Sequence, residues 1–233
     1  TPAADVALSE TIPLIRKAGI SVSEPASSWE QLLELGRAWE SDFIWMIPDL
    51  GVWTLAGGVV CFPSSWSMPA KLGMPMSEVH APVPQLNSLL GRQIDTFLTR
   101  MEPGKAWLRE NVGLSRDGER NHLPSRPRRP LDETTRVEEV FLRVESQLLY
   151  KLPGCGHILF GIRVDIYSLV DMRGIPEAVA GLRHLLLSIS PSAAEYKGLA
   201  TAREDALFAL FLAGDESGFF CGQGIPFAGG WAQ

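Results

Sequence analysis

The histidine at position 80 is the first candidate for chemistry in this sequence. It lies in the stretch "KLGMPMSEVHAPVP", where Pro82 and Pro84 follow it closely. Proline fixes its own backbone and restricts the residue before it, so the segment around the imidazole is held stiffly. A stiff frame suits a metal ligand, because a ligand must be kept in one orientation. A buried histidine with satisfied hydrogen bonds would fit the same pattern, and the residues alone leave both interpretations open.

The second candidate is a row of polar residues in the strand-like stretch "RVESQ". Side chains two residues apart on a strand share a face, so Arg143, Glu145 and Gln147 would point the same way. A cation, a carboxylate and an amide on one face can hold a polar ligand or orient other groups around it. A strand face that simply meets water would show the same alternation, so this hypothesis competes with a plain structural one.

Three further residues have chemistry that the sequence leaves ambiguous. Lys71 lies among prolines and glycines, where its ammonium group could bind a carboxylate or point into water. Cys155 lies in a glycine turn and could act as a thiolate ligand to iron, although His80 is the stronger candidate. His122 lies in a charged, proline-containing stretch, and we expect it to be solvated.

Composition narrows the class of protein. The chain has 233 residues, 45% of them hydrophobic, and a formal net charge of -6 with an isoelectric point near 5.3. An acidic chain of this kind is not expected to bind nucleic acid or an anionic membrane. Its three cysteines form no disulfide pattern, which favours a reducing, cytoplasmic location. Because residue 1 is threonine, the native N-terminus is expected to lie further upstream.

Hydrophobic periodicity predicts the elements that must position these side chains. Residues 1–26 are mixed and expected to be peripheral, and residues 113–135 are expected to form an exposed loop. Strands are predicted at 43–47, 52–62, 140–152 and 157–170, and helices at 27–42, 82–101, 175–189 and 201–213. The paired glycines at 57 and 58 predict a bulge or a close backbone approach. Clustered strands with helices beside them predict an α+β domain with an antiparallel sheet.

The stretches "CFPSSW", "KLGMPMSEVHAPVP", "LRVESQLLYKLP", "HILFGIRVDIYSL" and "EYKGL" occur here in that order. Together they resemble the haem-dependent oxidative N-demethylase family, whose known member oxidises dimethylamine. The resemblance spans roughly residues 43–200. It implies a PAS-like antiparallel sheet flanked by helices, with helical additions at both ends. The expected division is then an N-terminal extension at 1–42, a haem-binding domain at 43–200 and a C-terminal helix and tail at 201–233.

The resemblance also implies a chemistry and a set of site residues. It implies a monooxygenase that uses haem b, O2 and a small amine, with electrons from NAD(P)H through a separate flavin and [2Fe–2S] reductase. His80 would be the axial ligand of the haem iron, and Arg143, Glu145 and Gln147 would form or support the distal side of the haem. The residues implied at the haem edge are Ser64, Ser65, Trp66 and Lys71.

Two departures from the family pattern leave the substrate open. The family commonly has R-x-N-W where this chain has Arg109 and Asn111 followed by Val112, and Ser146 stands where a second arginine is usual. A different amine, or another oxidisable small molecule, is therefore compatible with the sequence. The alternative function is a haem-based gas sensor without catalysis, since PAS-like haem domains often sense oxygen. The sequence predicts no nucleic-acid or membrane partner and leaves the oligomeric state open.

Overall fold

The computed structural model describes residues 1–23, 27–132 and 134–200. Its elements, in chain order, are α1 (Pro2–Lys17), α2 (Ser28–Ala38), β1 (Asp42–Asp49), β2 (Val52–Val59), α3 (Met68–Lys71), α4 (Met76–Val79), α5 (Leu86–Arg100), β3 (Ala106–Ser115), β4 (Phe141–Lys151), β5 (Ile158–Ser168), α6 (Pro176–Ser188) and α7 (Pro191–Tyr196), with short 3₁₀ turns at Val137–Glu139 and Asp171–Gly174. The helix predicted at 201–213 and the tail predicted beyond it lie outside the described residues.

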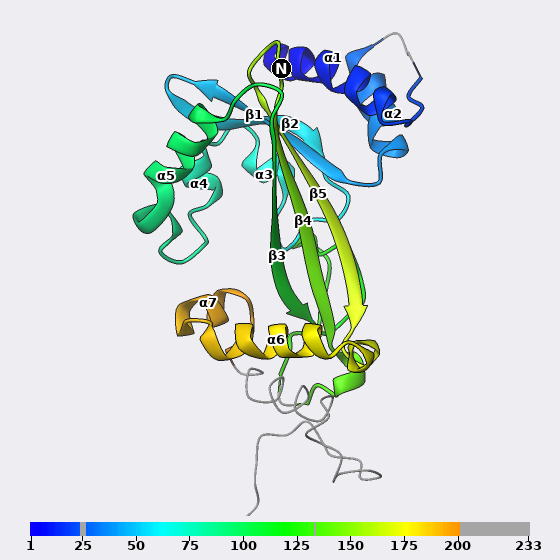
Figure 1. The fold of residues 1–233 in the computed structure, drawn as a ribbon, viewed down its shortest axis with the longest axis vertical. Helices are drawn as coiled ribbons and strands as arrows, with labels where there is room; N and C mark the ends of the chain where they lie inside the picture. Colours follow the sequence, from blue (N-terminus) through cyan, green and yellow to red (C-terminus); the bar gives the residue numbers. More distant parts are fainter. Residues whose placement is uncertain (24–26, 133, 201–233) are drawn as a thin grey trace, which may run out of the picture. The chain divides into compact units, whose positions relative to one another are not determined.

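Five strands form one open sheet in the order β2-β1-β5-β4-β3. The strands β3, β4 and β5 are the long arrows in Figure 1. The four predicted strands are confirmed, and so is the α+β class with an antiparallel sheet flanked by helices. The edge strand β3 was not predicted, because its first six residues are all exposed and show no apolar alternation. The name PAS-like for this sheet stays a prediction.

The chain divides into two compact units that share the long strands. Among the described residues, the first unit contains those within 1–111, 121–125 and 145–164, and the second contains those within 112–120, 126–144 and 165–200. Residues 1–42 therefore belong to the same unit as β1 and β2. The predicted division of the sequence at residues 42 and 200 stays a prediction.

In the first unit, β1 is buried on both of its faces. Phe43 and Trp45 join a core with apolar side chains of α1 and α2, whereas Ile44 and Met46 join a core with side chains of α4 and α5. Because strand side chains alternate, one strand supplies both cores. The sheet is consequently covered by a different pair of helices on each side of β1.

The expectation that residues 1–26 are peripheral is wrong. Helix α1 buries Ala7, Leu8 and Ile12 against the sheet. Its buried Thr11 hydroxyl accepts a hydrogen bond from the indole Nε1 of Trp45 at 3.0 Å and donates to the carbonyl of residue 7 at 2.7 Å. The polar residues between the apolar ones, together with a proline inside the helix, concealed this face in the sequence.

The second unit has its own apolar core, built on α6 and α7, which follow one another in Figure 1. The helix predicted at 175–189 is confirmed as α6. The expectation of a wholly exposed loop at 113–135 is wrong, because β3 continues to Ser115 and Leu131 enters this core. The buried Arg116 guanidinium forms ion pairs with Asp132 at 2.8 Å and with Glu139 at 3.2 Å.

The predicted irregularity at the paired glycines is confirmed. The register of β1 against β2 shifts between Trp45 and Met46, which lie opposite Gly57 and Leu55, so one residue of β2 bulges. Gly58 has a φ of 147°, and a Cβ added there would lie 2.1 Å from the carbonyl oxygen of Phe43. Only glycine combines that backbone with so close an approach.

Replacing Gly58 with alanine is therefore expected to lower the free energy of unfolding by about 2 kcal/mol or more. The matched control is Gly57→Ala, whose added Cβ would come no closer than 3.3 Å to another atom. Urea unfolding of both variants checks this prediction. Equal losses at the two positions would contradict it.

Candidate functional site

The polar row of β4 faces the protein interior. Arg143, Glu145 and Gln147 are buried, whereas Val144 and Ser146 between them are only half-buried. The interpretation of this row as a strand face that meets water is therefore wrong. Buried charged and amide groups must have hydrogen-bond partners, so their contacts indicate what the site is built around.

Glu145 is the centre of a hydrogen-bonded network in the first unit. The Ser64 hydroxyl donates to Glu145 Oε1. The amides of Asn111 and Gln147 donate to Glu145 Oε2 at 3.2 Å and 2.8 Å. Arg109 Nε in turn donates to Gln147 Oε1 at 2.5 Å. The three partners of Glu145 come from the loop after β2, from β3 and from β4 itself, and Arg109 comes from β3.

Sequence reasoning named Arg109 and Asn111 only as parts of a motif and missed them as site residues. They lie two residues apart on β3, so both side chains point to one face and reach the neighbouring β4. Knowing that "WLREN" is a strand paired with "RVESQ" would have revealed the contact. The missing signal was the apolar alternation that normally marks a strand.

The position of Ser64 is set by a backbone bridge. Residues 64 and 122 form an isolated parallel bridge, in which the amide of Ser65 donates to the carbonyl of His122 at 3.0 Å and the amide of His122 donates to the carbonyl of Pro63 at 2.9 Å. Ser65 is exposed and has a left-handed backbone with φ of 64°. The expectation that His122 is solvated is wrong, because it is only 3% exposed.

His80 caps the C-terminal end of the short helix α4, and its backbone amide donates to the carbonyl of Met76 at 2.9 Å. Lys71, at the end of α3, lies beside it. The Lys71 ammonium donates to the carbonyls of Glu78 and Val79 at 3.3 Å and 3.4 Å, which tethers it to the turn that carries the imidazole.

Burial and nearby positive charge favour the neutral form of the His80 ring by lowering its pKa. Burial lowers the pKa of His80 below its usual value, and the positive charges of Arg109 and Lys71 lower that pKa further, while Asp95 opposes the effect. Burial also lowers the pKa of Arg109, and the Glu145 carboxylate opposes that shift. A neutral imidazole has the lone pair that a metal ion needs.

The remaining predicted residues have different surroundings. Trp66 packs against the apolar core that contains Ile44 and Leu98. Arg143 belongs to the second unit, where its guanidinium donates to the backbone carbonyl of Glu119 at 3.3 Å. The structure therefore connects Ser64, Glu145 and Gln147 directly and gives Arg143 a separate contact.

Helix α5, which follows His80 in the sequence, carries exposed apolar side chains. The helix is confirmed as predicted, but Leu98 is the only buried residue within α5, whereas Leu89 is 63% exposed and Phe97 36% exposed. Phe97 meets Trp107 of β3 edge-to-face, with ring centroids 5.2 Å apart. Trp107 shares its strand face with Arg109, so the uncovered apolar groups and the polar network lie on the same side of the sheet.

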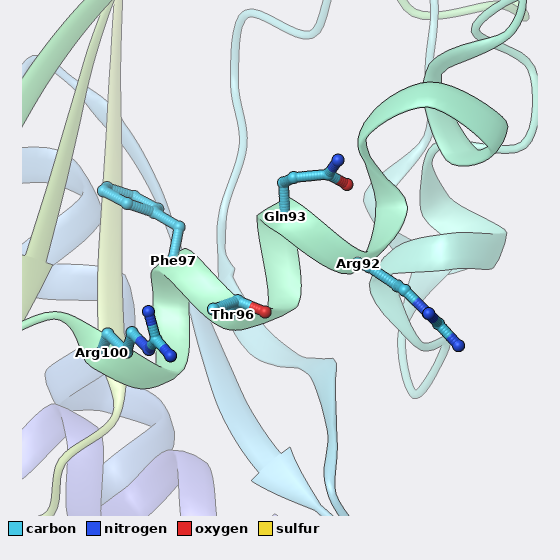
Figure 2. Close-up of a pocket in the computed structure, with 5 residues that line it drawn as sticks. All are labelled: Arg92, Gln93, Thr96, Phe97 and Arg100. Carbon is cyan, nitrogen blue, oxygen red and sulfur yellow. The ribbon is translucent and has the colours of Figure 1, made fainter.

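Another part of α5 has an open pocket, lined by Arg92, Gln93, Thr96, Phe97 and Arg100. Figure 2 shows the two arginines at opposite ends of this stretch of α5, with their guanidinium groups well separated in the view. Convergent polar groups are the mark of a binding site, and this pocket does not have them. The network around Glu145 is the better candidate.

The residues present suit a haem. A haem has three parts that a protein must bind. These are an iron that coordinates a neutral imidazole, a flat apolar ring, and two propionate carboxylates. His80 supplies the imidazole, Lys71 and Arg109 supply cations near it, and Leu89 and Phe97 supply uncovered apolar surface. The alternative ligand Cys155 is less suitable, because burial raises the pKa of its thiol and so disfavours the thiolate.

Removing one of the hydrogen-bond donors to Glu145 tests the network. Ser64→Ala is expected to lower the free energy of unfolding by about 1–3 kcal/mol, because a hydrogen bond to a buried charged group is lost. Ser64→Thr retains a hydroxyl and serves as the control. Thermal or urea unfolding of the two variants measures the effect. A Ser64→Ala protein as stable as the parent would show that Ser64 does not hold the carboxylate.

Among the described residues, no helix is both long enough and apolar enough to cross a membrane. Comparison with protein-family models matches residues 9–207 to the family described as haem-dependent oxidative N-demethylase, alpha subunit-like. The match begins inside α1 and takes in both units, including His80 and every residue of the Glu145 network. This chain belongs to the haem-dependent oxidative N-demethylase, alpha subunit-like family.

Proposed function

We propose that this chain is the haem-binding catalytic subunit of a monooxygenase that oxidises a small amine, by N-demethylation or a related reaction. O2 would be the co-substrate, and a separate flavin and [2Fe–2S] reductase would deliver electrons from NAD(P)H. The proposal rests chiefly on one observation. The half-buried imidazole of His80 lies within electrostatic range of Arg109, whose side chain is hydrogen-bonded into the network around the buried Glu145.

In this proposal the imidazole of His80 would bind the iron of a haem b. The cations at Lys71 and Arg109 would pair with the propionates, and such charge-assisted hydrogen bonds would orient the ring. Ser65 and Trp66 would lie near the haem edge. When bound, the haem iron supplies the oxygen binding and oxidation chemistry that amino-acid side chains lack.

The protein's own contribution centres on Glu145. A small alkylamine carries a positive charge at neutral pH, and a buried carboxylate is the group that best compensates it. Ser64, Asn111 and Gln147 hold this carboxylate in one orientation. The amide of Gln147 also connects it to Arg109, so the polar groups that face the substrate stay preorganised. Arg143 would support the site from its own position on β4.

His80→Ala is expected to abolish stoichiometric haem binding, because the proposed axial bond is lost. The absorption spectrum of the purified protein measures haem content and ligation. His184→Ala, at an exposed histidine of α6, is the matched control and should keep the parental spectrum. A His80→Ala protein with full haem content and an unchanged ferric spectrum would disprove the assignment.

Glu145→Gln is expected to weaken alkylamine binding by about tenfold to a hundredfold, because a hydrogen bond to a charged group is worth about 1.5–3 kcal/mol. Titration of the haem spectrum with dimethylamine and other small amines measures the affinity. Carbon monoxide binding to the reduced protein serves as the control and should be unchanged. Equal amine affinity in the parent and the variant would show that Glu145 does not bind the amine.

The rival function is a haem-based gas sensor. Oxygen consumption with a chemical reductant distinguishes the two, because a monooxygenase consumes O2 in an amine-dependent way and a sensor does not. A red protein that binds O2 but shows no amine-dependent consumption with any small amine would favour the sensor over the proposed enzyme.

A further inference from the structure

Residues 126–130, Arg-Pro-Arg-Arg-Pro, form an exposed basic segment that the proposed function does not use. All five residues are exposed, and none lies in a helix or a strand. The segment carries three arginines, although the chain as a whole has a net charge of -6. Positive charge concentrated on an acidic protein indicates a local binding surface rather than a general affinity for anions. We call residues 126–130 the arginine–proline segment.

The prolines give this segment a defined shape. Pro127 and Pro130 fix their own backbone and restrict Arg126 and Arg129 before them to extended conformations. In the polyproline II conformation, with three residues per turn, prolines at positions 127 and 130 lie on the same ridge. The prolines also lack backbone N–H groups, so the segment cannot add a regular strand to a sheet.

The second unit anchors the segment at its C-terminal end. Leu131 is buried in the core of that unit, and Asp132 is ion-paired with the buried Arg116 at 2.8 Å. Arg129 itself pairs with Glu139 at 2.9 Å. Glu139 also pairs with Arg116, so one buried arginine organises both anchors. A segment that is already stiff and anchored loses less conformational entropy when it binds.

We propose that the arginine–proline segment docks in a groove of a partner protein that is lined by aromatic side chains and flanked by acidic ones. Aromatic faces pack on a proline ridge, and this is how extended proline-rich segments are commonly recognised. Carboxylates at the edge of the groove would pair with Arg126 and Arg128. This inference is independent of haem binding and catalysis, because it concerns residues of the second unit alone.

Nucleic acid is the competing partner for a basic segment. The chain's net charge of -6 disfavours it, since the phosphate backbone would be repelled by most of the protein surface. The spacing of the prolines also has no role in contacts with phosphate. An acidic groove with aromatic walls accounts for both the arginines and the prolines.

The experiment uses two double variants of the full chain. Pro127→Ala with Pro130→Ala removes the ridge and keeps the charges. Arg126→Gln with Arg128→Gln removes charge and keeps the ridge, and the ion pair between Arg129 and Glu139 is retained. Arg92→Gln with Arg100→Gln, on α5 in the first unit, is the control for a general loss of positive charge.

The probe is a dye-labelled isolated SH3 domain with acidic residues flanking its aromatic groove, and fluorescence anisotropy at low salt measures its binding. Both segment variants are expected to bind about tenfold more weakly than the parent, which corresponds to about 1.4 kcal/mol, while the control keeps its affinity. Thermal unfolding should be the same for all variants. Haem content and amine-dependent activity should also be unchanged.

Four results would overturn the proposal. No binding by the parent, or an equal loss in the control, would show that the segment is not the docking surface. Loss in only one of the two segment variants would show that the ridge and the charges do not act together. Tighter binding to a single-stranded RNA 12-mer than to the protein probe would identify nucleic acid as the partner.

Discussion

The buried carboxylate of Glu145 is the interaction on which the rest of the site depends. A charge taken out of water is costly unless hydrogen bonds replace the lost solvation. Here donors come from Ser64 in the loop after β2, from Asn111 on β3 and from Gln147 on β4 itself. Satisfying one carboxylate therefore ties together three segments that are far apart in the sequence. The arrangement of the polar face follows from that requirement.

The helices α3, α4 and α5 are either short or partly exposed to solvent. α3 and α4 are four-residue helices separated by Gly73 and Pro75. Lys71 ends α3, and His80 follows the last residue of α4. α5 is longer, but its apolar residues Leu89, Leu90 and Phe97 are exposed. Exposed apolar groups on α5, together with the imidazole of His80 and the cations of Lys71 and Arg109, are the groups that a bound haem would require.

The second unit shows another use of a buried charge. Arg116 is buried and paired with two carboxylates, and these pairs order a stretch that looks disordered by composition alone. Charged, proline-rich stretches are usually too polar to fold by themselves. Arg116 and Leu131 are among the buried residues that anchor this stretch here. The arginine–proline segment remains exposed between residues that are held in place.

The sequence predicted the elements with strong periodicity and failed where periodicity was weak. The hairpin of β4 and β5, the strands β1 and β2 and the helices α2, α5 and α6 were predicted from alternation, capping residues and turns. The helix α1 and the edge strand β3 were missed. In α1, polar residues separate the apolar ones, and in β3 the first half is exposed on both faces. Neither α1 nor β3 has the hydrophobic periodicity from which helices and strands are predicted.

The sequence by itself determined the chemical types of the site, namely a histidine fixed among prolines and an alternating row of arginine, glutamate and glutamine. It also determined the family, because the motifs and their order are properties of the chain. Only the tertiary structure decided that the row is buried, that Arg109 and Asn111 join it and that His122 is enclosed. Burial and pairing depend on which distant segments meet, and local spacing carries no information about that.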